Sequence, residues 1–275
     1  MTTEIIIMWA AVTTYAVSAV LAIVGFVFRK PRVERAAVLV AGLGLAVHAV
    51  GIGYRWQRVG HAPFLGFYEV VSSYAFVGVA VFLGLLSRKR ALYPLAAAVM
   101  PIAFLVLGGA MLAPKSDLGI TGTLASWWLA IHVAFAKLSY GSFITAFCLG
   151  VLLIVRERRR AEGDALLGKL SPEALDDLVY KFVAAGFLFL GVMIAAGAIW
   201  ANEAWGRYWG WDPIETWSLI SWIAYALVLH ARLTLGWRGA RFAWAAMAAL
   251  PIVLFALVGV ALVYKSIHGA YLIGY

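Results

Sequence analysis

Tryptophan is concentrated in one short stretch of the chain. Six of the 12 tryptophans lie between positions 200 and 222, where a random distribution would place about one. An aromatic belt at a membrane surface accounts for one or two aromatic residues at a helix end, and it remains an alternative for Trp200 and Trp222. It does not account for the unbroken run W-G-R-Y-W-G-W-D-P-I-E-T-W at 205–217. Because flat indole rings offer apolar area with an N–H at the edge, we interpret this run as a binding site for a flat, mostly apolar ligand.

The end of this run has the pattern of a helix start. Asp212 is a good N-cap, Pro213 fits the first helical position, and Glu215 falls at the third, which gives a D-P-x-E variant of the capping box. We therefore predict that a helix begins directly after the loop. Gly206 and Gly210 allow the preceding backbone to turn or to approach a ligand closely.

Histidine is the residue type in this chain best suited to bind a metal. Neutral imidazole is the commonest protein ligand of metal ions, although each histidine can instead be a hydrogen-bonded core residue. The one cysteine, Cys148, lies in an apolar run, so the chain alone builds neither a disulfide framework nor a C-x-x-C site. The candidates are His48, His61, His132, His230 and His268.

The composition indicates what must position these residues. The chain has 275 residues, of which 64% are hydrophobic and 13% charged, with a mean hydropathy of +0.93. A soluble domain carries about a quarter charged residues, so a soluble enzyme is excluded and the apolar excess must face lipid. We predict an all-α polytopic membrane protein, with residues 1–275 as one integral-membrane domain. About eight transmembrane helices are expected, at about 5–28, 36–54, 68–86, 91–112, 128–155, 182–201, 218–235 and 242–264.

Basic residues cluster in alternate connections, which are therefore predicted to be cytoplasmic. These clusters lie at 29–35, 88–90, 156–160 and 238–241. Both termini are then expected on the extracytoplasmic side, with the Trp-rich run in an outer loop between helices six and seven. Since these clusters also account for the net charge of +9, we expect a lipid bilayer and no nucleic acid as partner.

Two further expectations concern the spans. The first span is predicted to be retained, because it lacks a small-residue cleavage site and is followed by basic residues. In the connection at 156–181, Ser171 and Pro172 predict a capped short helix that acts as an amphipathic connector.

The predicted topology separates the histidines by depth. His132 falls about one turn inside the outer end of the fifth span, and His268 lies just beyond the outer end of the eighth, so both are at the level of the Trp-rich loop. His230 is near the inner end of the seventh span. We favour a structural role for His48, and for His61 a role in organising its loop with Pro63 and Glu69.

The Trp-rich run, together with Y-A-L-V-L-H-A-R at 225–232, resembles the "WWD" signature of haem-handling cytochrome c assembly proteins. Within that superfamily the chain is most similar to the CcsA (ResC) type of the System II cytochrome c synthase. Supporting matches occur at 55–69, 128–140 and 264–271. One departure is Gly66, where many relatives carry Asn.

The resemblance implies haem b as the bound substrate. It implies that His132 and His268 are the external axial ligands of haem iron, and that His230 is a transmembrane ligand whose opposite ligand comes from a partner subunit. Lys137 carries a positive charge within a predicted span, so its side chain must either reach the membrane surface or pair with another group. It is a candidate to neutralise a haem propionate. Arg207 suits either a ligand carboxylate or a lipid phosphate. The implied haem-contacting residues of the Trp-rich run are Trp205, Gly206, Tyr208, Trp209, Trp211, Asp212, Pro213, Glu215 and Trp217.

The implied function is to deliver haem to the outer face and to position it for thioether attachment to the C-x-x-C-H motif of apocytochrome c. Haem lyase activity is expected only in complex with a ResB-type subunit. The abundance of Ala, Gly and Arg in the chain favours a bacterial inner membrane over a thylakoid membrane. One alternative is a haem exporter or chaperone of the CcmC kind, which has about six spans and no attachment activity. Another is a secondary transporter, although no inverted repeat is evident.

Overall fold

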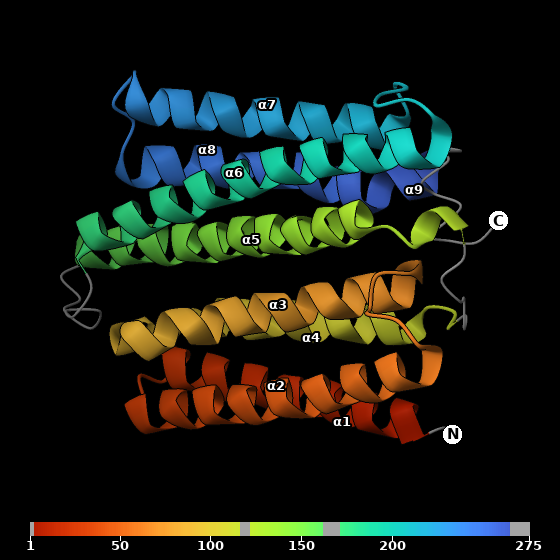
Figure 1. The fold of residues 1–275 in the computed structure, drawn as a ribbon. Helices are drawn as coiled ribbons and strands as arrows, with labels where there is room; N and C mark the ends of the chain where they lie inside the picture. Colours follow the sequence, from red (N-terminus) through yellow and green to blue (C-terminus); the bar gives the residue numbers. More distant parts are fainter. Residues whose placement is uncertain (1–2, 116–121, 162–170, 265–275) are drawn as a thin grey trace.

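The computed structural model describes residues 3–115, 122–161 and 171–264 (Figure 1). All regular structure in these residues is helical. The α-helices are α1 (Thr3–Val27), α2 (Pro31–Val59), α3 (Gly66–Arg88), α4 (Ala96–Leu112), α5 (Trp127–Ala161), α6 (Pro172–Trp205), α7 (Pro213–Leu233), α8 (Gly239–Leu254) and α9 (Val260–Val263). Short 3₁₀ turns form η1 (Arg90–Leu95) and η2 (Gly122–Leu124), and η3 (Phe255–Gly259) is a π turn.

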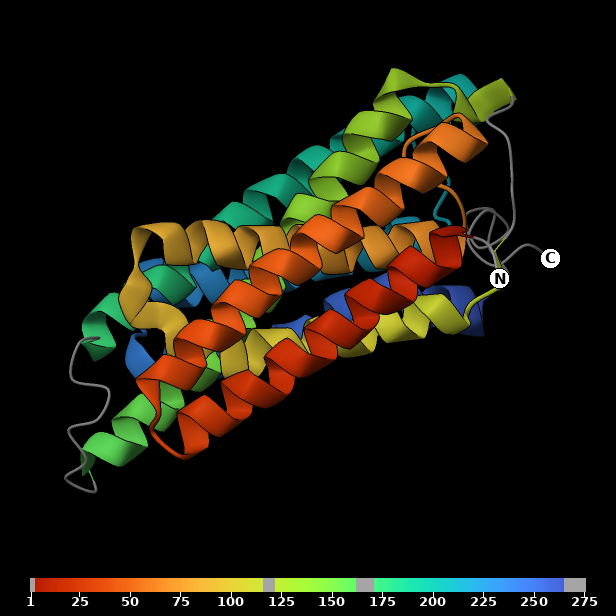
Figure 2. The same cartoon turned by 90° about the horizontal axis from the view of Figure 1, so that it is seen from below.

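Eight of the described helical segments are long and apolar enough to cross a membrane, which confirms the predicted number of spans. The segments α1 to α4 form one half of the bundle and α5 to α9 the other (Figure 1). Figure 2 shows α1 and α2 side by side along their lengths. The start of α1, the end of α9 and the α6–α7 connection lie at the same end of the bundle, which we call the Trp-loop end.

The helix α5 is the central element of the bundle. Inside the structure, 72% of its apolar window is buried, against 28–44% for the other spans. It packs closely on α6, because Gly186 leaves room for the ring of Phe143 and accepts a hydrogen bond from Ser139 Oγ at 2.9 Å. The same Phe143 ring stacks on Tyr225 of α7 at 3.6 Å. Helices α5, α6 and α7 are thereby held in one unit.

The predicted short connector before the sixth span is not a separate helix. Ser171 caps the helix as expected, since its side chain accepts a bond from the Ala174 N–H at 3.1 Å. The helix then continues without interruption to Trp205. No Pro or Gly follows Pro172 until Gly186, so nothing stops the helix before the apolar run begins.

The eighth span is interrupted where the sequence predicts one continuous helix. After Leu254 the backbone makes the π turn η3 before it resumes as α9. Pro251 lies inside α8, and proline cannot donate to the carbonyl four residues earlier. Such π turns inside helices occur often at functional sites.

Buried ion pairs fix the helices at both ends of the bundle. At the Trp-loop end, Glu4 of α1 contacts Arg55 and Arg58 of α2, at 3.2 and 2.8 Å, and accepts a bond from Tyr68 of α3. At the opposite end, Asp176 of α6 accepts bonds from Arg232 of α7 at 2.7 and 2.8 Å. It also accepts one from the backbone N–H at the start of α8.

Candidate functional site

The start of α7 forms the predicted capping box. Asp212 Oδ1 accepts a bond from the Ile214 N–H at 2.9 Å, and Glu215 Oε2 accepts one from the Asp212 N–H at 3.1 Å. Glu215 also accepts a bond from the Gly210 N–H at 2.8 Å. These bonds fix the loop before the helix, because three backbone N–H groups near the helix start now have partners. With Pro213 at the first position, the predicted helix start is confirmed.

The loop between α6 and α7, at 206–212, is shorter than the Trp-rich run. Two of its residues have a left-handed backbone conformation. Gly206 ends α6 with φ of +72°, which costs glycine little. Trp211 has φ of +57°, a conformation that costs a non-glycine residue about 1–3 kcal/mol. Its side chain is 70% exposed and meets Trp209 edge to face at 5.8 Å. Tyr208 is exposed as well, so this loop presents aromatic rings outside the bundle.

The six clustered tryptophans do not form one site. Trp205 ends α6 and packs edge to face on Trp200, whose indole N–H donates to the Thr123 carbonyl. Trp217 lies inside α7 and packs on Phe255 of η3 at 4.5 Å, a role in packing helices together. The sixth, Trp222, stacks on Phe187 of α6.

His132 lies in the second turn of α5, at the Trp-loop end. Its Nδ1 is 2.8 Å from the backbone carbonyl of Met193 on α6. A carbonyl can only accept, so the proton is on Nδ1, and Nε2 carries the lone pair with which an imidazole ligates a metal. Within the described residues, no three His, Cys, Asp or Glu side chains gather as a metal site. An imidazole nitrogen is the kind of axial donor that haem iron uses.

Gly197 holds the His132 ring in place by lacking a side chain. A Cβ atom at this position would lie 2.6 Å from Nδ1 and 2.9 Å from Cε1 of His132. The ring therefore rests directly on one turn of α6 between Met193 and Gly197. The sequence prediction missed this contact; the only available signal was a glycine in the sixth span at the depth of the Trp-rich loop.

His132 stands between two cavities. The larger, of about 140 Å³, lies between α3, α5, α6, α7 and η3 and is mostly apolar. The smaller, of about 50 Å³, lies under the loop and is lined by Tyr208, Trp209, Gly197 and Glu215. Of the nine predicted contact residues in the Trp-rich run, three line the smaller cavity: Tyr208, Trp209 and Glu215. The other six line neither cavity: Trp205, Gly206, Trp211, Asp212, Pro213 and Trp217. The larger cavity is lined by Phe64, Leu65, Val70, Tyr74, Leu124, Leu129, His132, Val133, Ala136, Tyr140, Met193, Trp200, Ile214, Ser218, Ala256 and Leu257.

The structure places one of the other two predicted iron ligands, His230, away from His132. His230 lies in the last turn of α7, at the end of the bundle opposite the Trp loop, and its ring is exposed. Its Nδ1 is 3.3 Å from Thr234 Oγ1. His268 lies outside the described residues, so its pairing with His132 stays a prediction.

His48 has the surroundings of a structural residue. It is fully buried between α1, α2 and α3, with Tyr15 Oη 3.3 Å from Nδ1 and Ser72 Oγ 3.0 Å from Nε2. Both ring nitrogens are engaged, and Phe76 packs on the ring edge. This arrangement fits the structural role that we favoured from the sequence.

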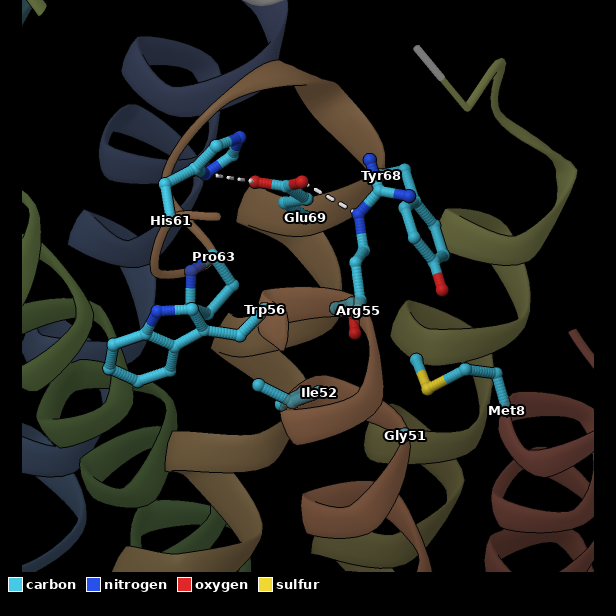
Figure 3. Close-up of a pocket in the computed structure, with 10 residues that line it drawn as sticks. Met8, Gly51, Ile52, Arg55, Trp56, His61, Pro63, Tyr68 and Glu69 are labelled. Atoms are coloured by element: carbon cyan, nitrogen blue, oxygen red, sulfur yellow. Dashed lines mark hydrogen bonds and ion pairs between the residues drawn. The ribbon is translucent and has the colours of Figure 1, made fainter. Parts of the chain in front are cut away.

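His61 and Glu69 organise the α2–α3 loop beside a small pocket (Figure 3). His61 Nδ1 is 3.7 Å from Glu69 Oε2, and Arg55 donates to the other carboxylate oxygen at 2.6 Å. Glu69 also accepts the Leu65 N–H, which caps the start of α3. These contacts fit the predicted loop-organising role.

Two lysines also lie near this end of the bundle. Lys137 of α5 donates from Nζ to the Pro63 carbonyl at 2.7 Å, so the charge within the span is partnered by the loop. Lys115 follows α4 and lies over the Tyr68 ring at 5.1 Å. Burial lowers the pKa of Lys115, and the nearby Glu4 carboxylate opposes that shift.

Comparisons with known proteins identify the family of this chain. Residues 64–268 match the family model described as cytochrome C assembly protein. The chain is 33% identical over 241 residues to the cytochrome c biogenesis protein CcsA of Guillardia theta, covering 79% of each chain. It is 34% identical over 270 residues to CcsA of Synechococcus sp. (strain CC9902), covering 87% of this chain and 86% of that one.

Among solved structures, the chain resembles the cytochrome c heme lyase CcmF with a TM-score of 0.70 and 16% identity. The match covers 94% of this chain and 49% of that one. At this identity the likeness establishes a shared fold.

Proposed function

Because this chain belongs to the cytochrome c assembly family and is of its CcsA type, we propose that it is the haem-binding membrane subunit of a System II cytochrome c synthase. Its substrate is haem b, which it presents at the extracytoplasmic face for attachment to apocytochrome c. The observation that carries this proposal is His132, whose Nδ1 is held by the Met193 carbonyl, so that Nε2 carries the lone pair of a ring that lines an apolar cavity at the Trp-loop end.

The residues around His132 suit haem as a substrate. An axial imidazole needs a fixed tautomer and a fixed ring plane, and Met193 and Gly197 supply both. The cavity walls are apolar and aromatic, as a porphyrin face requires. His268 is proposed as the second axial ligand, from the segment that follows α9.

The contribution to attachment is positioning. Each cysteine thiol of the C-x-x-C-H motif adds across a vinyl group: sulfur bonds to one vinyl carbon, and the thiol hydrogen goes to the other. The addition needs no net oxidant and no nucleophile from this chain. When haem is held in one orientation beside the thiols, the reacting groups no longer have to meet by diffusion. Such positioning removes a large part of the activation barrier of reactions of this kind.

The Trp-loop end is proposed to be extracytoplasmic. The basic runs 29–35 and 88–90 lie at the opposite end of the bundle, as do Arg238 and Arg241, and such runs are retained in the cytoplasm. This orientation places the start of α1 and the end of α9 outside, in a bacterial inner membrane.

His230 is proposed to ligate haem at a second, deeper position. An exposed imidazole on a membrane-spanning helix is costly against lipid and indicates a partner. A ResB-type subunit packed on this face of α7 would supply the opposite ligand, as the family resemblance implies.

Co-expression of the chain with a ResB-type subunit and an apocytochrome c tests the proposal. Haem that stays on the apocytochrome after denaturing electrophoresis is expected with the wild type and is expected to be lost in His132→Ala. A C-x-x-C-H client with both cysteines replaced by serine is the control for covalent attachment. Haem that binds this chain but never becomes covalent on a competent client would overturn the synthase assignment and favour an exporter or chaperone.

A further inference from the structure

Two tyrosines close the deep end of the larger cavity. Tyr140 lies eight residues after His132 on α5, roughly 12 Å further into the bundle at the rise of an α-helix. Tyr74 faces it from α3, with ring centroids 5.3 Å apart and ring planes at 64°. Both line the cavity, whose other walls at this depth are apolar side chains such as Val70 and Ala136.

The hydroxyl groups of these tyrosines are available to a ligand. Tyr140 is only 5% exposed, and neither phenol hydroxyl makes a hydrogen bond to another residue in the described part of the chain. Tyrosine hydroxyls inside a protein usually have a hydrogen-bond partner. The cavity therefore has two unpaired donors at a floor that is otherwise apolar.

A cationic residue precedes Tyr140 on α5. Lys137 is one helical turn before Tyr140 on α5, and its Nζ reaches the Pro63 carbonyl at 2.7 Å. The hydroxyl of Ser73, the residue next to Tyr74, lies 3.4 Å from the same carbonyl. The ammonium group is thus held at the α2–α3 loop, on the Trp-loop side of Tyr140.

We propose that this floor is a carboxylate-binding site that receives a propionate of haem. The hydroxyls of Tyr74 and Tyr140 donate to the carboxylate, and Lys137 supplies the compensating charge. The inference rests on the proposed function, since it assumes that haem occupies the cavity beside His132.

The site would fix which edge of haem faces the apocytochrome. The two propionates share one edge of the macrocycle, and the vinyl groups lie on the rings away from it. With a propionate held at the floor, the vinyl groups point toward the Trp-loop end, where the thiols arrive. Tyr74 and Tyr140 are positioning residues in this scheme, because they touch the substrate far from the reacting carbons.

Binding of haem and of haem dimethyl ester by the full chain in lipid nanodiscs tests the proposal. The ester keeps the ring and the iron but has no carboxylate. We expect the wild type to bind haem more tightly than the ester. Tyr140→Phe is expected to weaken haem binding about tenfold and to leave binding of the ester unchanged, since a hydrogen bond to a charged group is lost.

Tyr74→Phe and Lys137→Gln are expected to act in the same direction. Tyr93→Phe, on η1 at the other end of the bundle, is the matched control and should bind both ligands as the wild type does. Equal wild-type affinities for haem and ester would overturn the carboxylate site while leaving haem binding intact. A Tyr140→Phe variant that weakens both ligands equally would show a packing role and would also overturn it. A wild type that binds neither ligand would overturn the proposed function itself.

Discussion

Gly197→Ala tests whether the backbone of α6 positions the iron ligand. The new methyl group would lie 2.6 Å from Nδ1 of His132, about 1 Å inside normal contact between non-bonded atoms. The ring must then move away from α6 by about that amount, which stretches its 2.8 Å bond to the Met193 carbonyl beyond hydrogen-bonding range. Loss of the group that orients a metal-binding histidine typically lowers metal affinity about 10–100-fold, so we expect haem binding to weaken in that range.

The assay is an absorption titration of the purified chain with haem, alongside a thermal unfolding curve. Gly109→Ala on α4 is the matched control, because a Cβ there meets nothing within 4 Å. Both substitutions favour the helix by about 0.5–1 kcal/mol, so neither should unfold the bundle through its backbone. If Gly197→Ala binds haem as tightly as Gly109→Ala does, then the contact between α6 and His132 does not position the ligand.

Three substitutions probe the elements that support the site. Asp176→Asn leaves the buried Arg232 guanidinium without its charge partner and is expected to destabilise the fold by about 3–5 kcal/mol; an unchanged melting temperature in detergent would contradict this. Glu4→Gln should lower the melting temperature for the same reason, because Glu4 at the Trp-loop end is only 1% exposed and is paired with Arg55; an unchanged melting temperature would argue against a tight cluster there. Glu215→Ala removes two bonds to the loop backbone and should cost about 1 kcal/mol with a change in tryptophan emission; identical emission would mean that the loop is fixed by other contacts.

The features that the sequence predicts well are local. Asp212, Pro213 and Glu215 define a helix start through contacts within four residues, and the structure forms that capping box. Apolar runs of sufficient length likewise predict eight spans. The division of α6 into a connector and a span was wrong, because Ser171 marks where a helix starts and carries no information about where it ends.

The features that the sequence could not predict join distant parts of the chain. Gly197 and Met193 act on a histidine more than sixty residues earlier. Tyr74 and Tyr140 meet because α3 packs on α5. Nor does sequence clustering show which tryptophans share a site: Trp209 lines a cavity with His132, whereas others in the same run pack between helices.

The most direct test of the central claim is the reduced-minus-oxidised absorption spectrum of the chain purified with a ResB-type subunit. The wild type is compared with a variant that carries both His132→Ala and His268→Ala, each with and without added imidazole. We expect a low-spin haem spectrum that changes in the variant and is restored by imidazole, which replaces the missing side chains. A complex without haem, or identical spectra for the two proteins, would contradict haem ligation at the Trp-loop end.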